Sequence, residues 1–442
     1  GLGFKARPGS DLFILKLIPR DIMKKIIIPL ISILLPLCAA AQDKWPDGTP
    51  VDRWFTQTTP TDPKTLGKQY VVTDFGVVKG DSTLIQTEAI QAVIDLAADN
   101  GGGVITIPEG VYLSGSLFFK PGTHLNIAQG GRLKGSNAIT HYRIVKTRLE
   151  GQTINYFAAL VNADGVDGFT ITGPGTIDGD GWKFWDEFWL RRKVNPDCTN
   201  LEALRPRLVY ICNSNDVEVS NVRLVNSGFW TNHLYRCNRV KYLKDYIWAN
   251  TETYPKGPST DALDLDVCSD VLVDGCYMNV NDDAVCLKGG KGTYVEQNPD
   301  NGGNARVLVQ NCSFGRCNSG ITFGSEAWDC SNIILRDCKF KNTHHIVLFK
   351  MRPDTPQHYR NVLVENVKGN VLNGIQVSAW TQFYNKLDRD DMPISRVDNV
   401  TVRNVDVETT KGFYRNDKSP DFITSGFDFS NITADGKKFE LK

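Results

Sequence analysis

The sequence predicts an all-β fold: one right-handed, single-stranded parallel β-helix with a short N-terminal capping helix. Three observations favour this fold. A strand–turn–strand pattern recurs from about residue 165 onward, the repeats are unevenly spaced, and most cysteines take fixed positions within the repeat. Internal repeats with a period of about 20–50 residues are typical of solenoid proteins.

Each repeat begins with an apolar anchor residue in an alternating strand. The anchors are Val217, Val240, Val271, Val307, Ile333, Val362 and Val400, separated by 23, 31, 36, 26, 29 and 38 residues. A turn with Asn, Asp or Gly follows, and then further strand sequence. Such a unit cannot bury its apolar face alone and has to stack on its neighbours as a rung. A β-propeller would require antiparallel blades with more even spacing, so we favour the β-helix.

The cysteines form columns when the repeats are aligned. Six of them lie either three residues before an anchor (Cys237, Cys268, Cys330) or five residues after one (Cys276, Cys312, Cys338). In other repeats valine takes the second position, at Val222, Val367 and Val405. A position that is shared by Cys and Val is a small apolar core position. We therefore expect stacked thiols, with disulfides between neighbouring rungs as an open alternative.

A helix is expected just before the first strands. Ile90, Val93, Ile94 and Ala97 lie on one face of such a helix, and the glycines of 101–103 end it. Strands follow within residues 104–119. We expect this helix to cover the first rung, because an open rung would expose a sheet edge that could pair with another chain.

The N-terminal 67 residues differ in character from the repeats. Residues 23–41 contain a charged start, an apolar run and three alanines, which together are typical of a signal peptide; the run is too short to span a membrane. We expect residues 1–22 to be an upstream artefact or unstructured, 23–41 to be a signal peptide cleaved near Ala41, 42–67 to be an extension, and 68–442 to be the β-helix domain. The protein would then be periplasmic or secreted. Lipid attachment at Cys38 is disfavoured because Leu37 is bulky.

The charge of the chain excludes nucleic acid as a partner. The chain has 50 basic and 50 acidic residues, but residues 1–41 hold six of the basic and two of the acidic ones. The remainder therefore carries 44 basic and 48 acidic residues. No basic field is left to hold a polyanion.

Seven segments together resemble one enzyme family. Three precede or begin the repeats: VVTDFGVVKGD (71–81), TEAIQAVIDLAADNGGGVITIPEGVYLSGSL (87–117) and GPGTIDGDGWKFW (173–185). Four follow in order: STDALDLD (259–266), NDDAVCLKGG (281–290), NSGITFGSE (318–326) and IVLFKMR (346–352). They resemble glycoside hydrolase family 28, which contains polygalacturonases and rhamnogalacturonan hydrolases. The resemblance covers about residues 68–410. It implies that 68–442 is a catalytic domain which hydrolyses galacturonic-acid-containing pectic polysaccharide.

Asp261, Asp282 and Asp283 are the candidate catalytic residues. Adjacent carboxylates push each other's pKa values apart, as acid and base work requires. Asp261 lies 21 residues before Asp282, about one rung, and rungs stack at about 4.8 Å. An inverting glycosidase needs one carboxylic acid and one carboxylate that activates water. The resemblance implies Asp282 as the acid, with Asp261 and Asp283 positioning the water. We interpret three further acids as turn residues: Asp264, Asp266 and Asp270.

Two lysines are candidates for binding a sugar carboxylate. Lys288 shares strand parity with Asp282, whereas Asp283 has core parity and joins them only if the chain bends at 281–283. Lys350 ends the segment that matches the family's Ile-Lys. Ammonium groups suit the carboxylate of galacturonic acid. Four more candidates for substrate binding lie in or beside these segments: Ser319, Glu326, Arg352 and His345.

Several family residues are replaced while the acids are kept. Ser259 stands where the family has Asn, Ser319 where it has His, and Leu348 where it has Arg. These changes favour altered specificity, of a rhamnogalacturonan type or an exo-acting galacturonidase. His344 and His345 occupy the same repeat positions as Asp282 and Asp283, 11 and 12 residues after an anchor. One of them could line the groove in place of the missing His; the alternative is that both are ordinary turn residues.

Aromatic side chains are expected to form the sugar platform. We expect the candidates to lie on turns or loops near the motifs: Trp182, Trp185, Trp230, Trp328 and Trp380. The polar loop 380–392 is long enough to wall the groove.

Two other functions compete with hydrolysis. A β-helix polysaccharide lyase would use calcium-binding carboxylates and an Arg or Lys base. The other alternative is a non-catalytic carbohydrate-binding or structural β-helix, which the missing family His and Arg favour. We expect no cofactor and no metal, because carboxylates alone can run the hydrolysis. The expected partner is a pectic oligo- or polysaccharide, and we expect a monomer with no membrane span.

Overall fold

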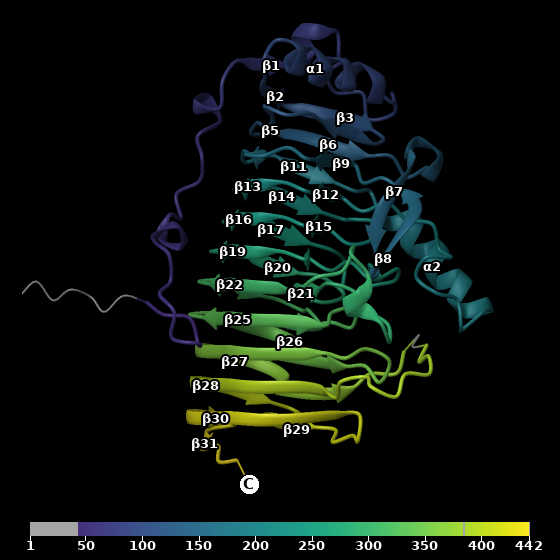
Figure 1. Cartoon of the computed structure of the whole chain (residues 1–442). Coiled ribbons are helices and arrows are strands. Elements are labelled where there is room, and N and C mark those ends of the chain that lie inside the picture. The colour runs from purple at the N-terminus through teal and green to yellow at the C-terminus, as the bar shows by residue number, and fades with distance from the viewer. Residues whose placement is uncertain (1–42, 383–384, 442) are drawn as a thin grey trace, which may run out of the picture. The chain divides into compact units, whose positions relative to one another are not determined.

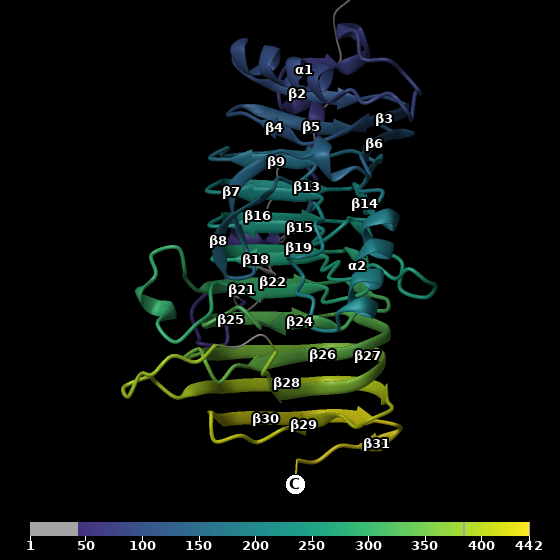
Figure 2. The ribbon, with the colours of Figure 1, turned by 90° about the vertical axis from the view of Figure 1, so that its right-hand side faces the viewer.

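Three stacks of parallel strands wind around a shared apolar core in the computed structural model (Figures 1 and 2). The structure describes residues 43–382 and 385–441, and Asp43–Lys442 form one compact unit. The expected artefact (1–22) and signal peptide (23–41) lie outside the described residues. The parallel β-helix predicted from the repeats is confirmed.

The strands of each stack pair in register with those of the next rung. The first stack contains β1 (Gln69–Val71), β2 (Gly103–Ile107), β5 (Thr123–Ile127), β10 (Thr170–Thr172), β13 (Asn215–Ser220), β16 (Asn238–Leu243), β19 (Ser269–Asp274), β22 (Asn304–Gln310) and β25 (Asp329–Arg336). The second contains β3 (Gly110–Ser114), β6 (Gly131–Gly135), β11 (Thr176–Asp178), β14 (Arg223–Val225), β17 (Tyr246–Trp248), β20 (Tyr277–Asn279) and β23 (Ser313–Phe314). The third contains β4 (Leu117–Phe119), β9 (Val161–Asp164), β12 (Val209–Cys212), β15 (Asn232–Tyr235), β18 (Leu263–Asp266), β21 (Val285–Lys288), β24 (Ser319–Phe323) and β29 (Tyr414–Asn416).

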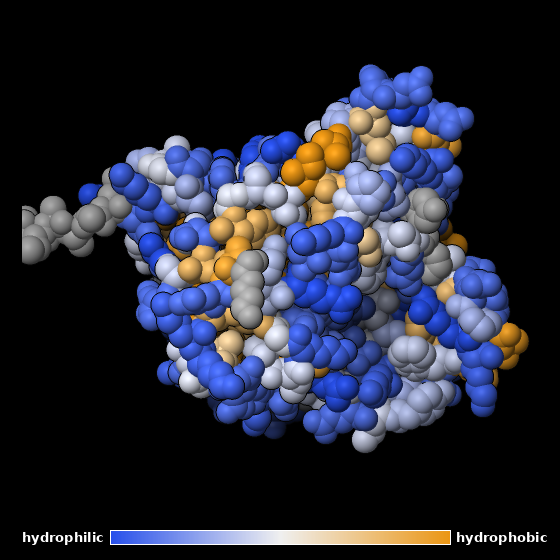
Figure 3. Space-filling model, turned by 90° about the horizontal axis from the view of Figure 1, so that it is seen from below, coloured by the Kyte–Doolittle hydropathy of each residue, from blue (hydrophilic) through white to orange (hydrophobic). Residues whose placement is uncertain are grey.

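Towards the C-terminus the strands lengthen and run through the corners between stacks. These strands are β26 (Lys339–Met351), β27 (His358–Ala379), β28 (Ser395–Thr409) and β30 (Phe422–Ala434), with β31 (Lys437–Lys438) pairing antiparallel on the last of them. The C-terminal end of the molecule presents a mainly hydrophilic face with small apolar patches (Figure 3).

The turn residues follow the predicted chemistry. The residue before each anchor has a left-handed backbone, with φ between 54° and 59°: Asp216, Arg239, Asp270, Arg306, Asn332, Asn361 and Asn399. The residue four positions after an anchor is left-handed as well, and it is most often Asn or Gly. Asn, Asp and Gly tolerate this backbone better than other residues do. Asp270 lies within β19 and not in a turn between strands, although its backbone is left-handed, and it pairs with Arg306 at 2.6 Å.

The core confirms the cysteine columns. All ten cysteines of the described residues are free and buried. The thiols of Cys276, Cys312 and Cys338 stack on successive rungs, where they are level with valines of other rungs. Because burial disfavours the thiolate, the pKa of Cys276 lies well above its ordinary value. These cysteines are packing residues.

The predicted capping helix is confirmed as α1 (Thr87–Asp99). Its buried residues are the four expected ones: Ile90, Val93, Ile94 and Ala97. They pack against β2, β4 and β5 at the N-terminal end of the β-helix (Figure 1). Gly102 ends the helix closely against the next turn, where an added Cβ would lie 2.4 Å from the carbonyl oxygen of Gly122.

Residues 43–67 form a strap along the outside of the first stack, which the sequence did not predict. It contains η1 (Arg53–Thr56) and η2 (Pro63–Thr65). Its apolar side chains cover a stripe of outward-facing strand residues: Leu243, Leu272, Leu308 and Ile334. Asp43 pairs with Arg336 at 2.5 Å, and the backbone amide of Thr61 donates to Glu218 at 2.7 Å. The strap therefore runs from β25 back towards the N-terminal rungs (Figure 1).

Two insertions stand beside the third stack, and neither was predicted. One is the antiparallel hairpin of β7 (Ile144–Leu149) and β8 (Gln152–Phe157), and the other is α2 (Trp182–Val194). The Trp185 indole donates to the Ser227 carbonyl at 2.9 Å and anchors α2 on the β-helix. The placement of Trp182 and Trp185 on turns was therefore wrong. Three further short helices are η3 (Val72–Phe75), η4 (Ile139–His141) and η5 (Val295–Gln297).

Within the described ranges, no helix combines the length and the apolar character that crossing a membrane requires.

The strap should contribute strongly to stability. Trp45 is 2% exposed, so Trp45→Ala removes a buried indole and should lower the free energy of unfolding by about 3–5 kcal/mol. The urea midpoint of the variant measures this. Trp182→Ala is the matched control, because Trp182 is 39% exposed. Equal midpoints for the two variants would contradict the packing of the strap.

Candidate active site

Strand pairing brings the three candidate acids to one place. Leu263 of β18 pairs with Val285 of β21, so Asp261 and Asp283, each two residues earlier, lie on neighbouring rungs. The amide of Ala262 donates to the Asp283 carbonyl at 3.0 Å and keeps this register ahead of the strands. The chain bends at Asn281 and Asp282, as the shared orientation of Asp282 and Asp283 requires.

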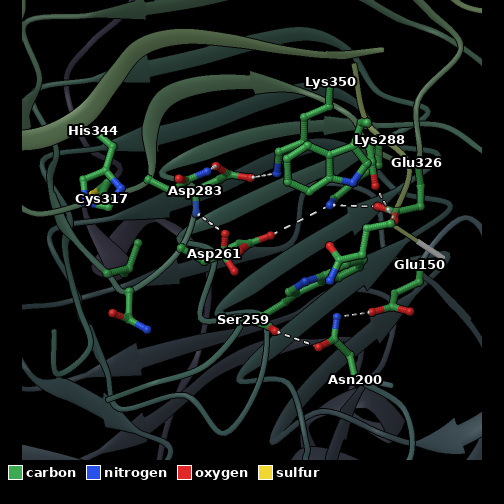
Figure 4. Close-up of a pocket in the computed structure, with 18 of the residues that line it drawn as sticks. Glu150, Asn200, Ser259, Asp261, Asp283, Lys288, Cys317, Glu326, His344 and Lys350 are labelled. Atoms are coloured by element: carbon green, nitrogen blue, oxygen red, sulfur yellow. Dashed lines mark hydrogen bonds and ion pairs between the residues drawn. The ribbon is translucent and has the colours of Figure 1, made fainter. Parts of the chain in front are cut away.

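One carboxylate oxygen from each of Asp261, Asp282 and Asp283 lies within 4.8 Å of the others. All three residues line a cavity of about 340 Å³ on the outside of the third stack (Figure 4). Asp261 and Asp283 are 3% and 1% exposed, whereas Asp282 is only partly buried. The structure therefore places two acids on the cavity floor and one nearer its mouth.

Lys350 and two polar side chains hold Asp283 as an anion. The Lys350 ammonium lies 2.8 Å from Oδ2 of Asp283, and the Asn318 amide and the Ser319 hydroxyl donate to Oδ1 at 2.6 and 3.1 Å. Burial opposes ionisation, but the charge and hydrogen bond of Lys350 outweigh it and lower the pKa of Asp283 to about 2. Asp283 is therefore ionised at any ordinary pH.

Lys288 balances the acids on the other side. Its ammonium lies 3.2 Å from Glu326, 3.7 Å from Asp264 and 3.8 Å from Asp261. Burial and the neighbouring Asp264 raise the pKa of Asp261 well above its ordinary value. Oδ1 of Asp261 has no hydrogen-bond partner among the described residues. That buried oxygen therefore keeps an unused capacity to accept a hydrogen bond.

Asp282 has the environment of a carboxylic acid. Burial and the charges of Asp261 and Asp283 raise its pKa well above the ordinary value. Within the described residues, its side chain accepts one hydrogen bond, from the Asp283 amide to Oδ1 at 3.1 Å. At neutral pH the site therefore combines a protonated Asp282 with an ionised Asp283, which is the division of labour that acid–base chemistry needs.

The two histidines lie in the columns expected from the repeat count. Asn318 and His344 follow Asp282 on successive rungs, and all three line the cavity. His345 lies one position further, in the column of Asp283 and Ser319, and is 9% exposed. Its ring bonds the Asn318 carbonyl at 2.8 Å and Gln376 at 3.0 Å. His344, rather than the predicted His345, is the histidine of the cavity surface.

Of three other residues predicted to contact the substrate, one lines the cavity and two lie behind its surface. Glu326 lines the cavity and pairs with Lys288. Ser319 is fully buried beneath it and bonds Asp283, so it positions the acid instead of facing a ligand. Arg352 is 2% exposed and pairs with Asp354 at 2.8 Å, which places it behind the cavity wall.

Sequence reasoning missed several residues of the site. Asp264 and Asp266 were assigned to turns, but both are buried in β18. Burial raises the pKa of Asp264 to about 8, so at neutral pH this carboxyl group beside Asp261 is protonated and uncharged. Asp266 pairs with buried Arg148 at 3.1 Å. The signal was available in LDLD, whose alternating Asp residues share strand parity and so face one side of β18.

The insertions also supply one wall of the cavity. Glu150 at the tip of the β7–β8 hairpin accepts a hydrogen bond of 2.9 Å from Asn200, and the Ser259 hydroxyl donates to Asn200 at 3.4 Å (Figure 4). No local sequence pattern could predict this series of hydrogen bonds, because its three residues are about 50 residues apart in the sequence.

Two of the predicted tryptophans line the cavity. Lys288 lies 4.7 Å from the ring centre of Trp230, and Lys350 lies 4.7 Å from that of Trp380. Trp380 and Gln382 belong to the loop that was expected to wall the groove. Trp328 lies in a different cavity, next to His358.

The acids are close enough to share a metal ion. Asp261, Asp282 and Asp283 form one such set, and Asp261, Asp264 and Cys286 form another. However, Lys288 and Lys350 already place positive charge against Asp261 and Asp283. A cation would have to compete with two buried ammonium groups.

Lys350→Met should raise the pKa of Asp283 above about 2, because the neutral side chain no longer favours the charged form. A carboxyl NMR titration measures this shift. In the wild type the folded pKa lies below the unfolded value of about 3.9. The resulting stabilisation is present above that value and disappears as the pH falls towards about 2. The variant should lose it, whereas Lys350→Arg should keep most of it; an unchanged titration in Lys350→Met would contradict the ion pair.

Comparison with known proteins agrees with this geometry. A family model described as "Glycosyl hydrolases family 28" matches residues 104–440. A probable polygalacturonase of Vitis vinifera is 28% identical over 230 residues, which is 50% of this chain and 44% of that protein. An exopolygalacturonase of Zea mays is 27% identical over 316 residues, 68% of each chain.

The fold is shared with solved structures. The exopolygalacturonase of Thermotoga maritima superposes with a TM-score of 0.63 at 19% identity, covering 84% of this chain and 93% of the other. At that identity the likeness concerns the fold alone.

Proposed function

Because the chain belongs to glycosyl hydrolases family 28 and is a glycoside hydrolase, we propose that it cleaves galacturonic-acid-containing pectic polysaccharide by inverting acid–base hydrolysis. The observation that carries this proposal is the cluster of Asp261, Asp282 and Asp283, whose carboxylate oxygens lie within 4.8 Å of one another on an open cavity. Carboxyl groups in such an arrangement can protonate a leaving oxygen and activate water at one bond.

Asp282 is the general acid in this proposal. It is the most exposed of the three acids, and its raised pKa keeps it protonated. Asp261 and Asp283 hold the attacking water between them. Asp283 supplies the full negative charge, and the unpartnered Oδ1 of Asp261 supplies a second acceptor.

The spacing of the acids leaves a stereochemical question to experiment. Inverting pairs are usually about 6.5–9.5 Å apart and retaining pairs about 5–5.5 Å, and the oxygens here are closer than either. We favour inversion because Asp283 is almost wholly buried and is held by Lys350, Asn318 and Ser319. A water molecule reaches such a recessed carboxylate more easily than the anomeric carbon of a sugar does.

A pectic substrate is supported by the relatives and by the charge of the cavity. The relatives are named as polygalacturonases and exopolygalacturonases, and four cationic side chains line the cavity. The replaced family residues at Ser259, Ser319 and Leu348 support a specificity other than ordinary endo-cleavage of homogalacturonan. The proposal includes export by the segment 23–41, which lies outside the described residues.

Asp282→Asn should lower kcat by about 10²–10⁴-fold, because the amide cannot donate the acid's proton. Reducing-sugar release from homogalacturonan and rhamnogalacturonan fragments measures this, with Asp270→Asn in β19, outside the cavity, as the control. Unchanged release in Asp282→Asn would favour a non-catalytic carbohydrate-binding protein.

The first product formed should have the inverted anomeric configuration. Proton NMR of the reaction in its first minutes distinguishes the anomers before they equilibrate. Retention would overturn the assigned water-positioning roles but leave hydrolysis intact. An unsaturated product that absorbs in the ultraviolet, together with loss of activity in EDTA, would instead indicate a lyase.

A further inference from the structure

A second cavity lies outside the catalytic one, and Trp328 lines it. Its volume is about 380 Å³, which is within the usual range for small-molecule sites. Trp328 directly precedes β25 and lies two residues after Glu326, which lines the catalytic cavity. No described residue lines both cavities, and the proposed hydrolysis uses none of the residues of the second one. We term it the Trp328 cavity.

The Trp328 cavity offers aromatic and apolar surface to a ligand. Its aromatic and apolar lining residues are Trp328, Pro356, Pro393 and Ile394. Trp328 is half-buried, and Ile394 is 45% exposed. An aromatic ring beside exposed apolar groups suits the C–H face of a sugar ring, because their contact removes apolar surface of both partners from water.

The indole of Trp328 lacks the hydrogen bond that fixes two packing tryptophans. Nε1 of Trp185 donates to the Ser227 carbonyl at 2.9 Å, and Nε1 of Trp189 donates to the Lys256 carbonyl at 2.7 Å. Nε1 of Trp328 is buried and has no partner among the described residues. Because an unpaired buried donor costs free energy, packing alone does not explain a tryptophan at this position.

Polar side chains from three successive rungs complete the lining. They are Asp329 of β25, His358 and Arg360 of β27, and Arg396 of β28 (Figure 1). Asp329 pairs in register with His358, and His358 pairs with Arg396, so these three residues form one column. All four residues are half-buried. They therefore present hydrogen-bond donors and acceptors beside the apolar lining.

The charges of the lining compensate one another. Each charged residue has a partner of opposite charge: Arg360 with Asp329, Arg396 with Asp398, and Glu296 with Arg389. An anionic sugar would meet no uncompensated cation there. Within the described part of the chain only Nη1 of Arg360 makes hydrogen bonds, so its other N–H groups remain for sugar hydroxyls. This chemistry fits a neutral sugar better than a uronate.

The Trp328 cavity lies close to the catalytic cavity. Glu326 and Trp328 line one cavity each and are two residues apart, so their Cα atoms are at most about 7 Å apart. The connection between β27 and β28 likewise contributes Trp380 to the catalytic cavity and Ile394 to the Trp328 cavity. A sugar in the Trp328 cavity would therefore lie beside a polysaccharide bound at the acids.

We propose that the Trp328 cavity is a second, non-catalytic carbohydrate site, which binds one neutral pyranose unit. The ring C–H groups of that unit pack on Trp328 and Ile394, and its hydroxyl groups bond Arg360 and the neighbouring polar side chains. The site itself does not depend on the proposed hydrolysis. Only the source of the unit, a neutral branch or neighbour of the pectic chain, rests on the proposed function.

Fluorine NMR of the full chain labelled with 5-fluorotryptophan tests the site. The chain has nine tryptophans, and the variants Trp328→Phe, Trp230→Phe and Trp380→Phe assign three signals by removing them. The Trp328 signal then reports the second cavity, whereas those of Trp230 and Trp380 report the catalytic one. The probes are the methyl β-D-pyranosides of galactose, glucose and xylose, with methyl α-D-galactopyranosiduronate as the anionic comparison.

At least one neutral glycoside should shift the Trp328 signal saturably and leave the Trp230 and Trp380 signals in place. The uronate should need a concentration about 10-fold higher or more for the same shift, because its carboxylate loses water without gaining an unpaired cation. Ile394→Ser and Arg360→Met should each weaken binding of the neutral glycoside by about 5- to 10-fold, through lost apolar contact and lost donors.

Ile144→Ser is the matched control for Ile394→Ser. Ile144 is an exposed isoleucine of β7 that lines neither cavity, so its replacement should leave glycoside binding unchanged. Unshifted signals of the other tryptophans show that each variant is folded. Equal binding in Ile394→Ser and in the control would overturn the placement of the sugar.

Three other outcomes count against the proposal. It is wrong if no neutral glycoside moves the Trp328 signal, or if the glycosides move only the signals of the catalytic cavity. Equal shifts by the uronate would overturn the assignment to a neutral sugar. Because the NMR signal needs no turnover, a wild type that hydrolyses nothing would contradict the proposed function alone. An active wild type with an unresponsive Trp328 would contradict this site alone.

Discussion

The parallel, in-register stacking of rungs is the constraint on which the site depends. Each strand of the third stack pairs residue by residue with the next. Side chains from segments more than 20 residues apart therefore form straight columns, in which neighbouring residues are about 4.8 Å apart. One column contains Asp261, Asp283, Ser319 and His345, and the adjacent column contains Asp282, Asn318 and His344. A one-residue slip in any rung would exchange the buried and the open column. The chemistry therefore depends on backbone pairing as much as on the acids themselves.

The concentration of buried charge on that surface sets the protonation states. Asp283 is ionised because Lys350 and two hydrogen-bond donors face it. Asp282, at the neighbouring position, keeps its proton because burial and the charges of Asp261 and Asp283 raise its pKa. The Lys288 ammonium interacts with three carboxyl groups, those of Asp261, Asp264 and Glu326. Both ammonium groups are therefore paired with carboxyl groups of the site itself.

The parts of the structure that lie outside the repeats shape the access to this surface. The β7–β8 hairpin and α2 bring Glu150 and Asn200 to one side of the cavity, and the segment around Trp380 contributes to its wall. The strap of residues 43–67 has a different effect: it covers apolar strand residues that would otherwise face solvent along four rungs. The insertions and the strap therefore cover different surfaces of the same β-helix.

The repeating architecture and the candidate acids could both be predicted from the amino-acid sequence alone. Alternating apolar residues, left-handed turn residues and cysteine columns recur at fixed offsets, so a local rule applied repeatedly yields the rungs, the capping helix α1 and the adjacency of Asp261 to Asp282 and Asp283. The same count placed a histidine in each column, but it could not distinguish the half-buried His344, which lines the cavity, from the buried His345.

What each polar side chain faces depends on how distant segments pack together. Whether Ser319 and Arg352 contact a ligand or support the wall depends on packing from the next rung, and Asp264 and Asp266 turned out to be buried strand residues because their partners, Lys288 and Arg148, come from segments far away in the sequence. The strap, α2 and the Glu150 wall depend in the same way on contacts between distant segments. The sequence repeat predicts where a residue lies within its own rung. Its burial and its ion pairs depend on residues of other rungs and of the insertions, which the repeat does not predict.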